Sequence, residues 1–285
     1  MNITAPQSVV VGVDDGQHAA LDYAAAEALR TGSPVRVVHA YVVPPSAMGA
    51  AYGVDVPESF REGGQEVLDS AVSHLTTNHP ELVIEPVLRR GFAPGVLEAE
   101  SGSARLLVIG PDASKPWYFR MFEGRVAHRL VEHAACPVVV VSDTWTPVHD
   151  ASSVVVLVDG ESRAHGPLAF AFEAAAQRGA ELQVVHVEPD ADPEHDAEWH
   201  AVRRLAETWF AAHPGVLGSA RVVHGDLRAA AIDVASTAGL LVLGRPHERR
   251  IANLALDSLA QDLVAAAGCP VAVVPAGHGL DVSPD

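Results

Sequence analysis

The chain is poor in aromatic, cysteine and basic residues, and each shortage argues against a class of protein. Phe, Trp and Tyr make up 5% of its 285 residues although 48% are hydrophobic, so the core must consist mainly of Ala, Val and Leu. The 2 cysteines are too few for a disulfide framework or a zinc cluster. With 19 Lys and Arg against 36 Asp and Glu, the net charge is −17, which disfavours nucleic-acid and anionic-membrane partners.

Long apolar runs are also missing. No uninterrupted apolar stretch approaches the ~18 residues of a membrane-spanning helix. The first residues, MNITAPQ, lack both the basic segment and the apolar segment of a secretory signal peptide. We therefore expect a cytoplasmic protein.

The most informative feature is an internal duplication. A Leu-Leu-Val-x-Gly segment ends at Gly110 and again at Gly244. A Cys-Pro-Val segment begins at Cys136 and again at Cys269, so both motifs recur at almost the same spacing. The repeat predicts two domains of similar structure, at 1–146 and 152–285.

Each half alternates short β-branched apolar runs with Ala-rich segments of helical character. Such alternation predicts an α/β fold with a parallel sheet and helices on both faces, and with ligands bound beyond the carboxyl ends of the strands. The expected strands are 9–13, 35–41, 82–87, 105–109 and 137–141, then 154–158, 182–187, 220–224, 240–243 and 270–274. The expected helices are 19–30, 58–76, 94–100 and 124–133, then 167–178, 194–213, 227–235 and 256–266.

The repeated motifs together resemble the universal stress protein family in its tandem, two-domain form. They are the strand-terminal Asp14 and Asp159, the Val-Val-His strands at 37–39 and 184–186, and the two segments that define the duplication. The resemblance implies a five-stranded parallel sheet in each domain, the adenine nucleotide alpha hydrolase-like fold. It also implies association through the last strands, as an intramolecular pseudo-dimer or a homo-oligomer.

Nucleotide-binding members of that family carry a glycine-rich loop between the fourth strand and the last helix. Glycines let backbone amides approach phosphates, and the helix N-terminus adds a partial positive charge. The resemblance implies a nucleotide site in the first half that consists of Asp14, Val38, Ile109, Gly110, Ala113, Gly124, Arg125 and Val126. The sequence contains no Walker-type Gly-Lys-Ser/Thr, so this is not a P-loop.

The loop of the first half departs from the family pattern but keeps its polarity. Ala113 stands where the middle glycine is usual, and Arg125 stands where Ser or Thr is usual. Arg125 offers a bidentate contact to a phosphate. We therefore predict that the first half binds an adenine nucleotide, ATP, with Mg²⁺ entering only together with the nucleotide.

The corresponding site of the second half is predicted to be degenerate. Its members are Asp159, Val185, Gly244, His247, Asp257 and Ser258. Asp257 replaces the glycine at the helix start, where a carboxylate is a good N-cap and takes the position meant for the anion. At about 4 Å and an effective dielectric near 20, this like-charge contact costs roughly 4 kcal/mol.

An aromatic segment in the first loop suggests a different function. Trp117, Tyr118, Phe119 and Phe122 lie close together in a chain that is otherwise poor in aromatics. They form a flap over a ligand, a surface for a protein partner, or a local packing cluster. The alternative to a nucleotide-binding stress regulator is therefore an interaction or scaffold protein that binds its partner through 117–122.

The residues give little support for an enzyme or a metal site. No nucleophile with an adjacent base and no paired carboxylates stand out, so we predict no catalytic residues, although weak ATP hydrolysis stays open. His195 and His200 are five apart, which spreads their imidazoles around a helix. No metal site is predicted.

Overall fold

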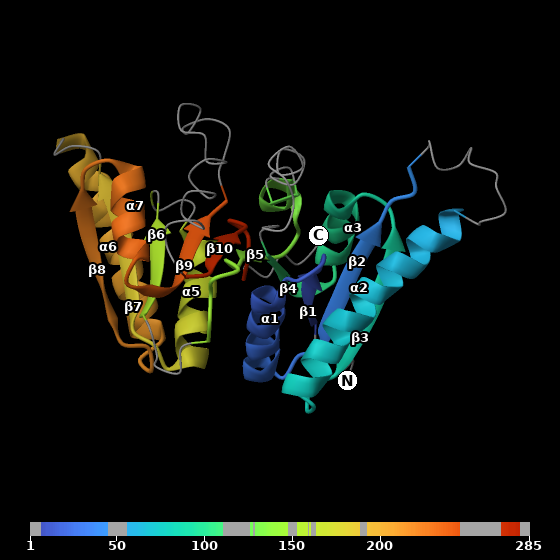
Figure 1. The fold of residues 1–285 in the computed structure, drawn as a ribbon. Coiled ribbons are helices and arrows are strands. Elements are labelled where there is room, and N and C mark those ends of the chain that lie inside the picture. The colour runs from blue at the N-terminus through green and yellow to red at the C-terminus, as the bar shows by residue number, and fades with distance from the viewer. Residues whose placement is uncertain are drawn as a thin grey trace, which may run out of the picture. The chain divides into compact units, whose positions relative to one another are not determined.

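The computed structural model describes residues 7–44, 56–110, 126–127, 129–147, 153–158, 160, 164–188, 193–245 and 269–279 (Figure 1). The chain divides into two compact units, Met1–Asp143 and Thr144–Asp285. The domain boundaries expected from the sequence, 1–146 and 152–285, remain predictions. Each unit is described below by itself.

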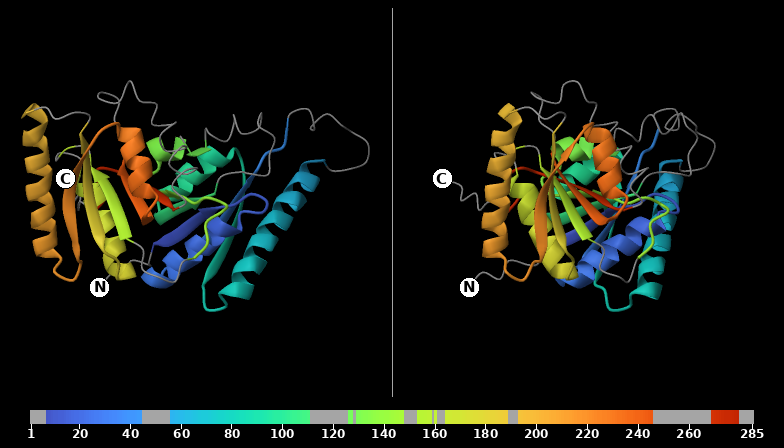
Figure 2. Two further views of the ribbon diagram at one scale, coloured as in Figure 1. Left: turned by 60° about the vertical axis from the view of Figure 1, so that its left-hand side comes forward. Right: turned by 90° about the vertical axis from the view of Figure 1, so that its left-hand side faces the viewer.

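The first unit is a five-stranded sheet in the order β3-β2-β1-β4-β5, and all its strand pairs are parallel. Helix α2 runs alongside β3 in Figures 1 and 2. Its elements are β1 (Ser8–Gly12), α1 (His18–Thr31), β2 (Val35–Tyr41), α2 (Val56–Asn78), β3 (Ile84–Arg90), α3 (Ala93–Ser101), β4 (Ala104–Ile109) and β5 (Val138–Val140).

The second unit repeats this arrangement with the strand order β10-β9-β6-β7-β8, again with parallel pairs. The predicted fold class, two repeated α/β domains with helices packed on five-stranded parallel sheets, is confirmed. Its elements are β6 (Ser153–Val158), α5 (His165–Arg178), β7 (Leu182–Glu188), α6 (Pro193–Ala212), β8 (Gly218–His224), α7 (Leu227–Ala235), β9 (Ala238–Gly244) and β10 (Val271–Val274).

The central strands and first helices form where the sequence predicts them. Val9, Val10 and Val11 are fully buried in β1, as expected for a strand covered on both faces. Helix α1 ends at Gly32, whose φ of 63° is left-handed, and α5 ends in the same way at Gly179, with φ of 61°. A residue with a Cβ is disfavoured in that conformation, so glycine sets both helix ends.

The edge strands differ from the prediction. Strand β3 was expected at 82–87, but it begins at Ile84 and continues to Arg90. Leu82 instead belongs to a turn, because its N–H donates to the carbonyl of His79 at 3.1 Å. An edge strand has partly exposed faces, so its polar last residues carry no apolar signal. In the second unit the edge strand differs in the opposite direction. Strand β8 begins at Gly218, ahead of the predicted start at Ala220.

The last helix of each half was predicted at 124–133 and at 256–266. In the first half, residues 126–127 and 129–133 are helical, and in the second half the predicted helix lies outside the described residues.

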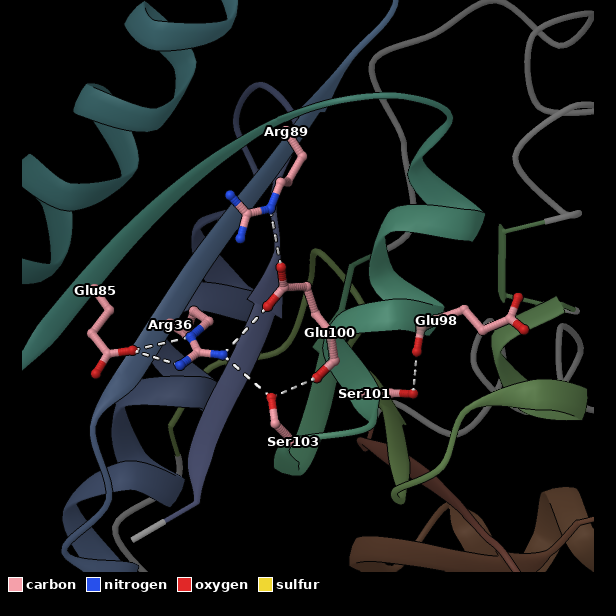
Figure 3. A network of polar contacts seen from close by, with 7 residues as sticks. All are labelled: Arg36, Glu85, Arg89, Glu98, Glu100, Ser101 and Ser103. Carbon is pink, nitrogen blue, oxygen red and sulfur yellow. Dashed lines mark hydrogen bonds and ion pairs between the residues drawn. The ribbon is translucent and has the colours of Figure 1, made fainter. Parts of the chain in front are cut away.

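A polar network fastens α3 to the sheet of the first unit (Figure 3). Arg36 on β2 donates through Nε to Glu85 at 3.0 Å and through Nη1 to Glu100 on α3 at 3.3 Å. Arg89 on β3 donates to the other oxygen of Glu100 at 3.3 Å. Arg36 also donates to the hydroxyl of Ser103 at 3.4 Å. Glu100 is therefore shared by two guanidinium groups, and its side chain is only 12% exposed.

In the second unit, apolar side chains join the corresponding helix to the sheet. Strand β8 corresponds to β3, and helix α7 corresponds to α3. The same difference in residue number separates the two strands and the two helices, so residues can be compared position by position. In this alignment Val223 replaces Arg89, and Val234 replaces Glu100. Val234 is 3% exposed and belongs to an apolar cluster against which Val223 packs. The two units therefore share a backbone arrangement, but one has ion pairs where the other has apolar contacts.

Both cysteines are buried thiols, each 4% exposed. Burial raises the pKa of the Cys269 thiol to about 11, and its Sγ–H donates to the carbonyl of Ala235 at 3.6 Å. At pH 8 roughly one such thiol in a thousand is a thiolate, the reactive form.

We expect Ellman's reagent at pH 8 to leave the native chain unmodified and to detect both thiols after denaturation. Rapid reaction of the native chain would contradict the burial.

Candidate functional site

The carboxyl end of β1 leads into a loop that holds Asp14. The N–H of Val13 donates to the carbonyl of Val38 on β2 at 2.9 Å, and the carbonyl of Val13 contacts Nδ1 of His39 at 2.8 Å. Beyond this point, the N–H of Asp14 donates to Gln17 Oε1 at 3.2 Å, and Asp14 Oδ1 accepts from the N–H of Asp15 at 3.0 Å. Asp14 is therefore fixed at the strand end and is partly exposed.

The sheet register brings several predicted site residues to this edge. Gly12, the last residue of β1, pairs with Val38 on β2 and with Ile109 on β4. Gly110 follows Ile109 directly and lies against the start of α1, near Gln17 and Ala20. Val38 and Ile109 are 1% and 5% exposed, so they are the buried residues at this end of the sheet, here called the floor of the site. Asp14 and Gly110 lie next to these two residues.

Packing against the described residues does not require a glycine at position 110. A Cβ built there would lie 3.4 Å from Gln17 Cδ and 3.5 Å from Ala20 Cβ, which are ordinary contacts. At Gly12 an added Cβ would approach Leu97 Cδ1 to 2.8 Å, so a side chain there would have to displace that of Leu97. Among the described residues, Gly12 thus lies in tighter packing than Gly110, for which these residues give no packing reason.

The other predicted members of the first site are only partly described. Val126 is helical and half-buried. Ala113, Gly124 and Arg125 lie outside the described residues, as does the aromatic segment 117–122. Their assignment to the site remains a prediction.

The second unit repeats the floor of this edge. Val185 on β7 is fully buried, and Gly244 ends β9, where an added Cβ would lie 3.2 Å from Pro167 Cγ at the start of α5. His186 Nδ1 contacts the carbonyl of Val158 at 2.9 Å, as His39 does with Val13. Asp159, His247, Asp257 and Ser258 lie outside the described residues.

The role of the two strand histidines was not predicted from the sequence. His39 and His186 are 8% and 4% exposed, and each holds the carbonyl of the residue that precedes the strand-terminal Asp. A carbonyl can only accept, so Nδ1 carries the proton in both rings. The recurrence of His at one position of two apolar strands is the sequence signal from which this role could have been predicted. Gln17 gave no comparable signal.

Among the described residues, no group of three or more His, Cys, Asp or Glu side chains could hold a metal ion. None of the described helices combines the length and apolarity that crossing a membrane requires.

The arrangement in two similar units agrees with a comparison with known families. The sequence model of the Universal stress protein family matches residues 6–142 and 151–275. The chain belongs to the universal stress protein family. The two matches fall on the two halves of the duplication, so this is a tandem universal stress protein.

Relatives of similar length occur in mycobacteria. Universal stress protein Rv2623 of Mycobacterium tuberculosis (strain ATCC 25618 / H37Rv) is 27% identical over 287 residues, which cover 93% of this chain and 95% of that protein. Universal stress protein Rv2005c of the same strain is 27% identical over 285 residues, which cover 93% of this chain and 96% of that protein.

A solved structure has the same fold. It is a universal stress protein from Archaeoglobus fulgidus DSM 4304, with a TM-score of 0.68 and 16% identity, and the match covers 94% of this chain and 96% of that one. At this identity, the similarity establishes the fold alone.

Proposed function

We propose that this tandem universal stress protein is a cytoplasmic stress-response regulator that binds an adenine nucleotide, ATP, in its first unit. In this proposal Asp14 binds the nucleoside, Val38 and Ile109 underlie it, and Gly110 opens the phosphate loop toward Gly124 and Arg125. Mg²⁺ enters only with the nucleotide, and the second site is degenerate. The chain acts through binding, because its sequence offers no general base or metal carboxylate cluster for catalysis.

The observation that carries this proposal is the glycine at position 110. Packing against the described residues would accept a side chain there, since their nearest atoms to an added Cβ lie at 3.4 to 3.5 Å. A bare backbone at the end of a strand is what close approach of a ligand requires. The neighbouring Asp14, held by its loop hydrogen bonds, supplies the polar partner for a nucleoside.

The test is the substitution Gly110→Ala. We expect the free energy of unfolding to change by less than about 0.5 kcal/mol, since no contact is broken. We expect ATP affinity to fall on the order of tenfold, about 1.4 kcal/mol, because the new methyl group meets the ligand. Calorimetric titration with ATP and denaturant unfolding of the same preparation give the two quantities.

The matched control is Gly63→Ala on α2, where an added Cβ has no neighbour within 4 Å. It should leave ATP binding unchanged. A parent chain that releases no heat with about 1 mM ATP, near the weak limit of useful binding, would refute nucleotide binding. That result would favour a partner-binding role for 117–122.

A further inference from the structure

The outer edge of the second unit's sheet presents backbone groups that no neighbouring strand pairs. Strand β8 is the outermost strand of this unit and, among the described residues, it pairs with β7 alone (Figure 1). The N–H of Leu182 donates to the carbonyl of Leu217 at 2.8 Å, and the N–H of Gly225 donates to the carbonyl of Glu188 at 2.9 Å. Successive residues of a strand direct their backbone groups to opposite sides, so the odd-numbered residues from 217 to 225 bond to β7. The residues whose N–H and C=O point away from β7 are Gly218, Ala220, Val222 and His224.

The corresponding edge of the first unit is blocked by a proline. The ladder between β2 and β3 alternates in the same way, since the N–H of Val35 donates to the carbonyl of Val83 at 2.9 Å. The even-numbered residues of β3 therefore point away from β2, and Pro86 is one of them. Proline has no N–H, and on an edge strand it hinders the pairing of a further strand. When β3 and β8 are aligned from their first residues, Ala220 takes the place of Pro86, so the edge of the second unit lacks this block.

Two exposed side chains beside the β8 edge indicate what it can bind. Arg221 is exposed, and within the part of the chain that the structure describes it has neither an ion pair nor a side-chain hydrogen bond. Leu217, four residues earlier, is 74% exposed. Residues four apart in an extended chain lie on the same face of a sheet, roughly 13 Å from each other at about 3.3 Å per residue. In the first unit Val87 takes the place of Arg221, so this combination of a cation and an unblocked edge occurs in the second unit.

We propose that the β8 edge binds an extended segment of a partner protein, which adds to the sheet as a further strand. The outward N–H and C=O groups of Ala220 and Val222 bond to the backbone of the segment, as in other cases of strand addition. A carboxylate side chain of the segment pairs with Arg221 through two hydrogen bonds. An apolar side chain four positions from that carboxylate covers Leu217 and removes it from water. One carboxylate is enough, because the net charge of −17 repels a strongly acidic partner.

A second copy of this chain fits the edge less well than such a segment. Arg221 is the middle residue of β8, so antiparallel pairing of two β8 strands over their full length places it opposite the same residue of the other copy. Like charges directly opposite each other destabilise a strand pair. Two chains that each carry a net charge of −17 also repel each other. The partner is therefore a different protein.

Fluorescence anisotropy of a labelled peptide, TVEVTVLT, with the full-length chain tests the proposal. Its Glu and Leu are four positions apart, and its Val and Thr residues favour an extended strand. We expect Arg221→Ala in the chain, or Lys in place of Glu in the peptide, to weaken binding on the order of tenfold, as for a lost hydrogen bond to a charged group. Arg61→Ala is the matched control, because it removes the same charge from an exposed pair with Glu58 on α2. It should bind the peptide as the parent does.

The substitution Ala220→Pro transfers the block of the first unit to the second. It should weaken peptide binding at least about tenfold, because it removes an outward N–H and places a ring where the peptide backbone lies. The unfolding transition should change little, since this N–H is not part of the ladder with β7. In the parent, the peptide should slow hydrogen exchange at the N–H groups of Ala220 and Val222. If Ala220→Pro fails to fold, Arg221→Ala and the exchange measurement decide the result.

Three results would overturn the proposal. They are a parent chain that does not bind the peptide at about 1 mM, an Ala220→Pro chain that binds it like the parent, and a Lys peptide that binds as tightly as the Glu peptide. Sedimentation velocity tests the other occupant. A dimer of the free chain that Ala220→Pro converts to a monomer would assign the edge to a second copy and would also overturn the proposal. ATP is absent from these measurements, so their outcome is independent of nucleotide binding by the first unit.

Discussion

A chain with Asp257→Gly and His247→Gly is expected to bind ATP in its second unit up to about a thousandfold more tightly than the parent second unit does. A carboxylate about 4 Å from a phosphate costs roughly 4 kcal/mol at an effective dielectric near 20. At about 1.4 kcal/mol for each factor of ten, this is nearly three decades of affinity. The scaffold for the site exists, because Val185 is buried and Gly244 ends β9 as their counterparts do in the first unit.

The measurement is an ATP titration of chains that also carry Gly110→Ala. This substitution lowers the ATP affinity of the first site, so binding at the second site can be detected. Asp226→Gly is the matched control, because Asp226 is also an aspartate at a helix start, where it caps α7 by accepting from the N–H of Ala229 at 2.9 Å. Its removal should not change ATP binding. If the double variant binds no better than its background, the electrostatic explanation for the degenerate site is wrong.

The second large effect is expected in the polar network of the first unit. Glu100→Val should lower the free energy of unfolding by about 2–3 kcal/mol, because it removes the carboxylate that Arg36 and Arg89 share. The loss stays below that of a fully buried pair, since Arg89 is 56% exposed and Arg36 keeps Glu85. Chemical unfolding followed by circular dichroism measures the change in the transition of the first unit.

A double variant tests the mechanism of that loss. Arg89→Val together with Glu100→Val installs the residues that stand at the same places in the second unit, Val223 and Val234. We expect it to recover most of the stability, because apolar packing often replaces an ion pair without loss. Glu58→Gln, which breaks the exposed pair with Arg61, should leave the unfolding transition nearly unchanged. A double variant as unstable as Glu100→Val would show that the apolar packing of α7 does not transfer to α3.

The scaffold could be predicted from sequence because its signals are local and repeated. The buried runs of β1 and β6, the helix ends at Gly32 and Gly179, and the duplicated motifs all lie within short windows. The length of β3 could not be predicted, since an edge strand ends in polar residues such as Arg90.

The chemistry of the strand ends depends on pairing between distant segments, and here the sequence was insufficient. His39 reaches the carbonyl of Val13 from a different strand. Glu188 is 1% exposed although its sequence neighbours give no indication that a carboxylate would be buried there. Only the register of β7 and β8 places His224 opposite it. Periodicity identifies a strand but does not specify which polar side chain meets which.

The exchange of an ionic face in one unit for an apolar face in the other has a thermal consequence. Burial of apolar surface gives unfolding a large positive heat-capacity change. The stabilisation that the apolar packing of α7 contributes therefore weakens on cooling. The desolvation penalty of ion pairs falls as temperature rises, so the α3 face keeps its cohesion better on warming. A single duplicated backbone has thereby acquired two different temperature responses within one polypeptide.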